Sequence, residues 1–99
     1  MRLTSHQQKI ITRFVHRHYG ENAQVFLFGS RTNDRKRGGD IDLLLEGIRD
    51  EDNTAMRKAS LIADLKRELG DQRIDLVVKT AENQRAPFIR MVDDEKIRL

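Results

Sequence analysis

The sequence contains no cysteine and no tryptophan, one proline, one tyrosine and four phenylalanines. Without cysteine, the chain can form neither a disulfide nor a thiolate metal site. No apolar run approaches the roughly 20 residues that cross a bilayer, and residues 1–18 lack the apolar region of a signal peptide. We therefore expect a cytoplasmic protein that makes no membrane contact. With so few aromatic residues, the sequence does not indicate which of them would stack on a nucleobase.

Charge of neither sign is in large excess. The chain has 19 lysines and arginines against 16 aspartates and glutamates, a net charge of +3. A dedicated nucleic-acid-binding protein usually concentrates a basic excess on one face, so this balance does not favour nucleic acid as a partner. A length of 99 residues fits a single domain, residues 1–99, whose modest core a partner protein would help to stabilise.

Local patterns predict three helices and three strands. Thr4 and Ser5 offer capping-box starts, apolar residues follow at helical spacing, and Gly20 ends the first helix. Polar residues 50–53 are expected to cap the second helix, which Gly70 ends. The resulting order is typical of an α/β (α+β) domain in which helices flank a small mixed sheet. The predicted elements are a helix over 5–19, strands over 24–28 and 41–45, a helix ending at Gly70 with an inward stripe of Ala55, Ala59, Ile62, Leu65 and Leu69, a strand over 73–79, and a helix after Pro87 with Phe88, Met91 and Val92 on its apolar side.

Two aspartates open the second strand. In Asp40-Ile41-Asp42, alternation along the strand points both carboxylates to one face and Ile41 to the other. Asp75, at the start of the third strand, joins them if that strand neighbours the second. Clustered carboxylates need a compensating cation, and oxygen-only ligands favour Mg²⁺ or Mn²⁺ over zinc. Two such ions, about 3.5–4 Å apart, would clamp the attacking and leaving oxygens of a phosphoryl or nucleotidyl transfer.

A glycine-serine turn precedes this acidic segment. Gly29 permits a close backbone approach or an unusual φ, and Ser30 offers an amide and a hydroxyl where phosphate oxygens are favoured. The basic residues of the loop over 31–37 can meet phosphate charge, although such loops are commonly solvated turns. Arg31, adjacent to Ser30, is the strongest candidate among them. Gly29, Ser30 and Arg31 are thus the predicted nucleotide-binding residues.

With these motifs the chain resembles the minimal nucleotidyltransferases of the DNA polymerase beta superfamily. Members carry Gly-Ser, a loop of similar length, Asp-x-Asp and a later strand carboxylate, and the resemblance extends from the first helix through Asp75. It implies a polymerase-beta-like palm in which Asp40 and Asp42 hold the Mg²⁺ ions and Gly29 and Ser30 bind the triphosphate of ATP. Asp75 would bind the catalytic ion and favour deprotonation of the acceptor hydroxyl.

The resemblance also implies a partner. Small members of this family commonly pair with helical HEPN-type proteins as antitoxin and toxin, so this chain would adenylylate its partner within a hetero-oligomer and silence it. Another class of function stays open: a catalytically inactive module that neutralises the helical partner by binding alone. Nucleic-acid binding through the basic loop ranks last.

Apolar residues near the C-terminus admit two interpretations. They form either a stripe that contacts a partner or, more commonly for such a pattern, a cover for the domain's own sheet. These residues are Phe88, Met91, Val92, Ile97 and Leu99.

Overall fold

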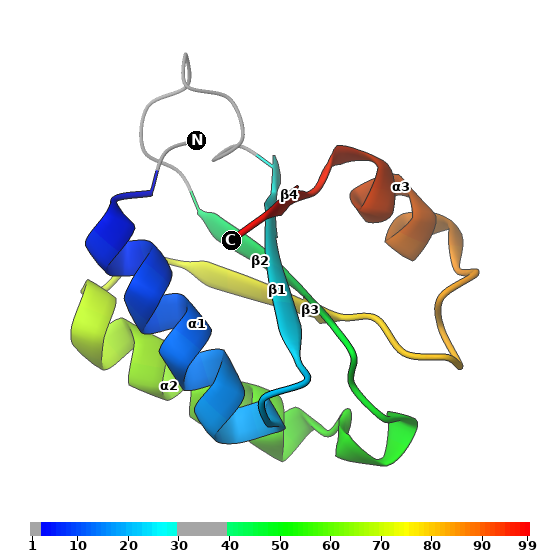
Figure 1. The fold of residues 1–99 in the computed structure, drawn as a ribbon, viewed down its shortest axis with the longest axis horizontal. Helices are drawn as coiled ribbons and strands as arrows, with labels where there is room; N and C mark the ends of the chain where they lie inside the picture. Colours follow the sequence, from blue (N-terminus) through cyan, green and yellow to red (C-terminus); the bar gives the residue numbers. More distant parts are fainter. Residues whose placement is uncertain (1–2, 30–39) are drawn as a thin grey trace.

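The structure, a computed structural model, describes residues 3–29 and 40–99 (Figure 1). The three helices and three strands predicted from the sequence are confirmed, with small shifts at their ends. Two short elements, η2 and β4, are not predicted by the sequence patterns. The elements are α1 (Ser5–Tyr19), β1 (Gln24–Phe28), β2 (Ile41–Glu46), the 3-10 helix η2 (Asp50–Asp52), α2 (Ala55–Leu69), β3 (Ile74–Val78), α3 (Pro87–Glu95) and β4 (Ile97–Arg98).

The strands form one mixed sheet, as predicted, in the order β3-β2-β1-β4. β1 pairs antiparallel with both β2 and β4, whereas β2 and β3 run parallel. Since β2 and β3 run parallel, both strands begin at the same end of the sheet. At that end the Ile41 amide donates a 3.0 Å hydrogen bond to the Arg73 carbonyl. The two strands that carry the predicted metal ligands are therefore direct neighbours.

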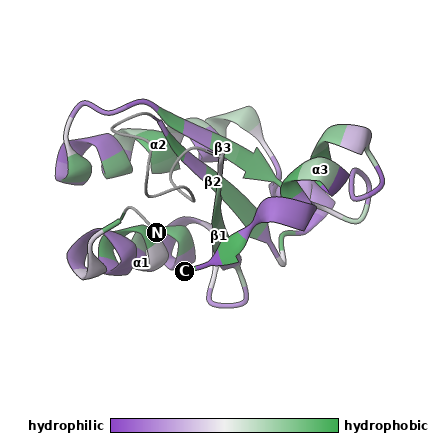
Figure 2. Cartoon of the chain, turned by 90° about the horizontal axis from the view of Figure 1, so that it is seen from above, coloured by the Kyte–Doolittle hydropathy of each residue, from purple (hydrophilic) through white to green (hydrophobic). Residues whose placement is uncertain are grey.

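Helices α1 and α2 cover one face of the sheet and α3 lies on the other (Figure 2). Ile41, Leu43 and Leu45 of β2 are completely buried on the side of α1 and α2, where they belong to the larger apolar cluster. Thr4 begins α1 with a capping box that includes Gln7, as the sequence indicates. Within the described parts of the chain, no helix is both long and apolar enough to cross a membrane.

The second helix corrects two expectations. Thr54 caps α2 by accepting a hydrogen bond from the Arg57 amide, while the polar residues before it form η2 instead of the cap. The inward stripe is confirmed only in part. Leu65 is completely buried and Ile62 and Leu69 pack against the core, as predicted, whereas Ala55 and Ala59 are exposed and Leu61 is buried in addition. The difference follows from side-chain size, since α2 buries its bulky leucines and leaves the small alanines of its first turns exposed.

The third helix buries only part of the face expected from the sequence. Ile89 and Val92 are buried, and Val92 packs in a cluster with Phe26, Phe28 and Leu44 of the sheet. Val92 is thus buried as expected, whereas Phe88 and Met91 are 52% and 56% exposed. The proposed C-terminal stripe is likewise divided, because Val92 belongs to this cluster and Leu99 packs against the core on the α1 and α2 side.

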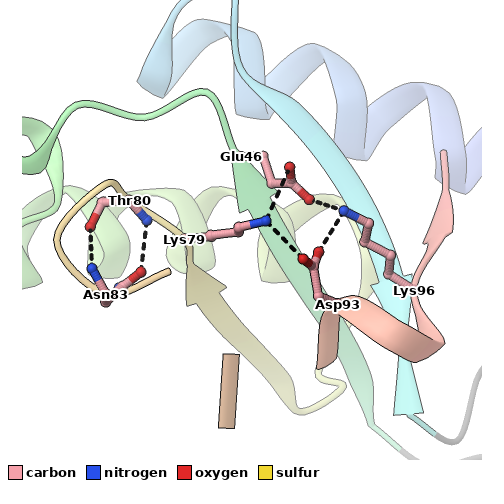
Figure 3. Close-up of polar contacts among 6 residues, drawn as sticks. All are labelled: Glu46, Lys79, Thr80, Asn83, Asp93 and Lys96. Carbon is pink, nitrogen blue, oxygen red and sulfur yellow. Dashed lines mark hydrogen bonds and ion pairs between the residues drawn. The ribbon is translucent and has the colours of Figure 1, made fainter. Parts of the chain in front are cut away.

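A four-residue charge cluster fastens α3 to the sheet (Figure 3). Lys79 Nζ lies 2.8 Å from Asp93 Oδ2 and 3.8 Å from Glu46 Oε1. Lys96 Nζ lies 2.6 Å from Asp93 Oδ1 and also pairs with Glu46. Each lysine thus bridges the same two carboxylates, and the balanced cluster fixes α3 above the far ends of β2 and β3. Asp42 and Asp75 lie on the same face of the sheet as this cluster, but near the beginnings of the two strands.

Candidate metal and nucleotide site

Three aspartates from two neighbouring strands meet at one end of the sheet. Asp40 precedes β2, Asp42 lies within β2, and Asp75 lies opposite Asp42 in the register of β3. One oxygen from each carboxylate lies within 4.8 Å of the other two. We call Asp40, Asp42 and Asp75 the carboxylate triad. The structure brings together the three residues selected from the sequence, all of them partly buried.

Crowding changes the ionisation of the central member. The pKa of Asp42 is raised to about 6 by partial burial, by a hydrogen bond with the Asp75 carboxyl, and by the charges of Asp75 and Asp40. Arg73 acts in the opposite direction, but its effect is the smallest. Two like charges about 4 Å apart repel by about 4 kcal/mol at an effective dielectric of 20, so the triad is unfavourable when fully ionised and unoccupied by a cation.

The donor set fits a hard divalent cation. All three side chains offer carboxylate oxygens, which Mg²⁺ and Mn²⁺ prefer, and the described site contributes no nitrogen or sulfur ligand. A divalent ion would also relieve the repulsion that raises the pKa of Asp42. Asp40, Asp42 and Asp75 are therefore the residues that would hold such an ion.

Gly29 lies directly against the triad. It follows β1, whose last residue, Phe28, pairs with Asp42. Gly29 has φ of +74°, and a Cβ built there would lie 2.3 Å from Asp42 Oδ2. Any side chain at this position would therefore displace the Asp42 carboxylate, and the positive φ itself favours glycine. Ser30 and Arg31, the other predicted nucleotide-binding residues, lie outside the described residues.

Sequence reasoning missed one residue of the site, Arg73. Its Nε lies 3.5 Å from Asp75 Oδ1 and 3.7 Å from Asp40 Oδ2. The signal was available, because Arg73 stands two residues before Asp75 and strand alternation places residues two apart on one face.

We expect the affinity of the chain for Mn²⁺ to rise as the pH increases through 6. A carboxyl must lose its proton to bind a metal, and the pKa of Asp42 lies at about 6. Calorimetric titration with Mn²⁺ at several pH values measures this effect. An affinity that stays constant between about pH 5 and 7 would contradict the role of Asp42 as a ligand.

The free energy of unfolding of the metal-free protein is expected to fall as the pH rises over the same range. The pKa of Asp42 is 3.8 without its neighbours and about 6 in the folded state, so the native state binds the proton more tightly. The contribution of Asp42 to the free energy of unfolding therefore decreases as the pH rises from 3.8 through about 6. Denaturation of wild type and Asp42→Asn across this range isolates that contribution, because the variant lacks the titrating group.

Comparison with known proteins places this geometry in context. A family model described as a nucleotidyltransferase domain matches residues 8–99, which include the whole carboxylate triad and Gly29. No individual curated protein matches the chain.

Proposed function

The chain belongs to the nucleotidyltransferase domain family, and from that premise we propose that it transfers AMP from ATP to a hydroxyl group of a partner protein. The observation that carries this proposal is the carboxylate triad beside the side-chain-free backbone of Gly29. The donor set suits the Mg²⁺ that accompanies a nucleotide triphosphate, and we infer that two such ions bind. The acceptor as a protein and the donor as ATP rest on the resemblance to minimal nucleotidyltransferases.

In the proposed reaction, the acceptor oxygen attacks the α-phosphorus of ATP. The bond between that phosphorus and the oxygen bridging to the β-phosphate breaks, and pyrophosphate leaves. When bound, divalent ions would neutralise charge on the attacking and leaving oxygens. Asp40 and Asp42 would hold these ions, and Asp75 would also favour removal of the acceptor proton. Gly29, Ser30 and Arg31 remain the candidates for contact with the triphosphate.

We expect Mg²⁺ with ATP to raise the melting temperature of the chain, because a ligand that binds only the folded state stabilises it by mass action. At about ten times the dissociation constant the gain is about 1.4 kcal/mol, which corresponds to about 6–10 °C for a domain of this size. Asp40→Asn should remove the shift. Asp94→Asn is the matched control, since Asp94 is an exposed aspartate of α3 outside the triad. An unchanged shift in Asp40→Asn would contradict the assignment of Asp40 as a ligand.

We further propose that the acceptor is a helical HEPN-type toxin and that this chain is its antitoxin, within a cytoplasmic hetero-oligomer. The resemblance to minimal nucleotidyltransferases supports this assignment. The competing function is neutralisation by binding alone, without catalysis. A variant with all three triad aspartates changed to asparagine separates the two: an enzyme would lose neutralisation while still binding the toxin, whereas a binding module would keep both.

A further inference from the structure

Arg73 occupies the place of a cation beside the carboxylate triad. Its guanidinium bridges Asp40 and Asp75, with Nε–oxygen distances of 3.7 and 3.5 Å. Among the residues that the structure describes, it is the only basic side chain whose ion pairs reach the triad. The two carboxylates that it joins come from the beginnings of different strands. Arg73 is therefore a counter-ion for two of the three carboxylates of the triad.

The backbone and the side chain of Arg73 differ in freedom. The backbone is fixed, since its carbonyl accepts the 3.0 Å hydrogen bond from the Ile41 amide that aligns β2 with β3. The side chain, in contrast, is 73% exposed. It can therefore leave the triad by rotating about its own bonds, without any repacking of the core.

We propose that Arg73 is the resident counter-cation of the carboxylate triad and that it competes with the divalent metal for Asp40 and Asp75. A guanidinium and a divalent ion of hard character need oxygens of the same carboxylates, and their positive charges repel each other. Loading of the metal thus requires Arg73 to swing away. This inference rests on the proposed function only in taking the triad as the metal site.

Removing the arginine charge should tighten metal binding, whereas loss of a merely structural contact would not. Arg73→Gln is expected to bind Mn²⁺ more tightly than wild type, by about three- to tenfold, since two exposed ion pairs no longer oppose the metal. The same variant should melt at a lower temperature without metal and gain a larger increase when Mn²⁺ is added. Arg73→Lys, which retains the charge but not the planar fork, should lie closer to wild type.

The test measures the dissociation constant of Mn²⁺ alone, without nucleotide, at pH 7.5, from the signal of free Mn²⁺ in electron paramagnetic resonance. Arg90→Gln, an exposed arginine of α3, controls for the change in net charge. Tighter binding by Arg73→Gln than by Arg90→Gln would support the competition, and equal or weaker binding would overturn it. If neither wild type nor Arg73→Gln binds Mn²⁺ at the triad, the metal site of the proposed function fails, and this inference fails with it.

Discussion

Asp42→Asn is expected to abolish nucleotidyl transfer and, at the same time, to make the metal-free protein more stable. The amide keeps the shape of the carboxyl but cannot supply its charge to a divalent ion, and removing a metal contribution of several kcal/mol lowers the rate by about three orders of magnitude. The stability rises because the substitution removes an ionised group whose partial burial, together with the neighbouring Asp75 and Asp40, raises its pKa to about 6.

Two measurements on one variant decide this prediction: pyrophosphate release with Mg²⁺ and ATP, and thermal denaturation without metal above pH 7. Asp94→Asn is again the control, because it makes the same chemical change on α3. A fall in activity together with a rise in metal-free stability is the result expected when a crowded charge serves the function of the site. Full activity in Asp42→Asn, or a metal-free variant less stable than wild type, would contradict the role assigned to Asp42.

Gly29→Ala is expected to destabilise the chain and to displace the carboxylate of Asp42. Alanine at φ of +74° is strained, and its Cβ would lie 2.3 Å from Asp42 Oδ2. The strain costs about 1–2 kcal/mol, and moving the carboxylate adds less, because it is the far end of a flexible side chain. Because the displaced atom belongs to a predicted metal ligand, we expect Mn²⁺ binding to weaken together with folding stability. Chemical denaturation and Mn²⁺ titration measure the two effects.

Gly70→Ala is the matched control for this substitution. Gly70 has φ of +93°, and no heavy atom lies within 4 Å of a Cβ built there, so alanine introduces the backbone strain without the collision. The excess destabilisation of Gly29→Ala over Gly70→Ala is therefore the cost of the contact with Asp42. That excess should shrink when Asp42→Ala is combined with Gly29→Ala, since the colliding oxygen is gone. Strictly additive changes in the free energy of unfolding would show that a Cβ at residue 29 does not collide with the Asp42 side chain.

Local signals in the sequence were sufficient for most of the elements. Helix α1 was predicted with its correct ends because its capping box and its terminal glycine are contiguous signals. Strand β2 was recognised from its apolar run, and alternation correctly placed Asp40 and Asp42 on one face. The proximity of Asp75 was conditional, because the pairing of β2 with β3 is a tertiary fact that no local pattern specifies.

The errors also have physical causes. The nine residues of α3 carry apolar side chains on more than one face, so the sequence does not specify which face is buried. The structure buries Val92, as expected, in a cluster with Phe26 and Leu44, and it buries Ile89 instead of Phe88 and Met91. Strand β4 is too short to have a periodicity, and only its pairing with β1 defines it. The counter-ion role of Arg73 likewise depends on Asp40 being brought across from the neighbouring strand.

The most direct test of nucleotidyl transfer follows the phosphate label itself. The chain is incubated with Mg²⁺ and the co-expressed helical protein that we propose as its partner, with ATP labelled at the α-phosphate in one sample and at the γ-phosphate in another. Nucleotidyl transfer predicts that label from the α position alone appears on protein and that Asp42→Asn prevents it. Label from the γ position would indicate a kinase, and no label from either position in an intact complex would contradict catalysis at the carboxylate triad.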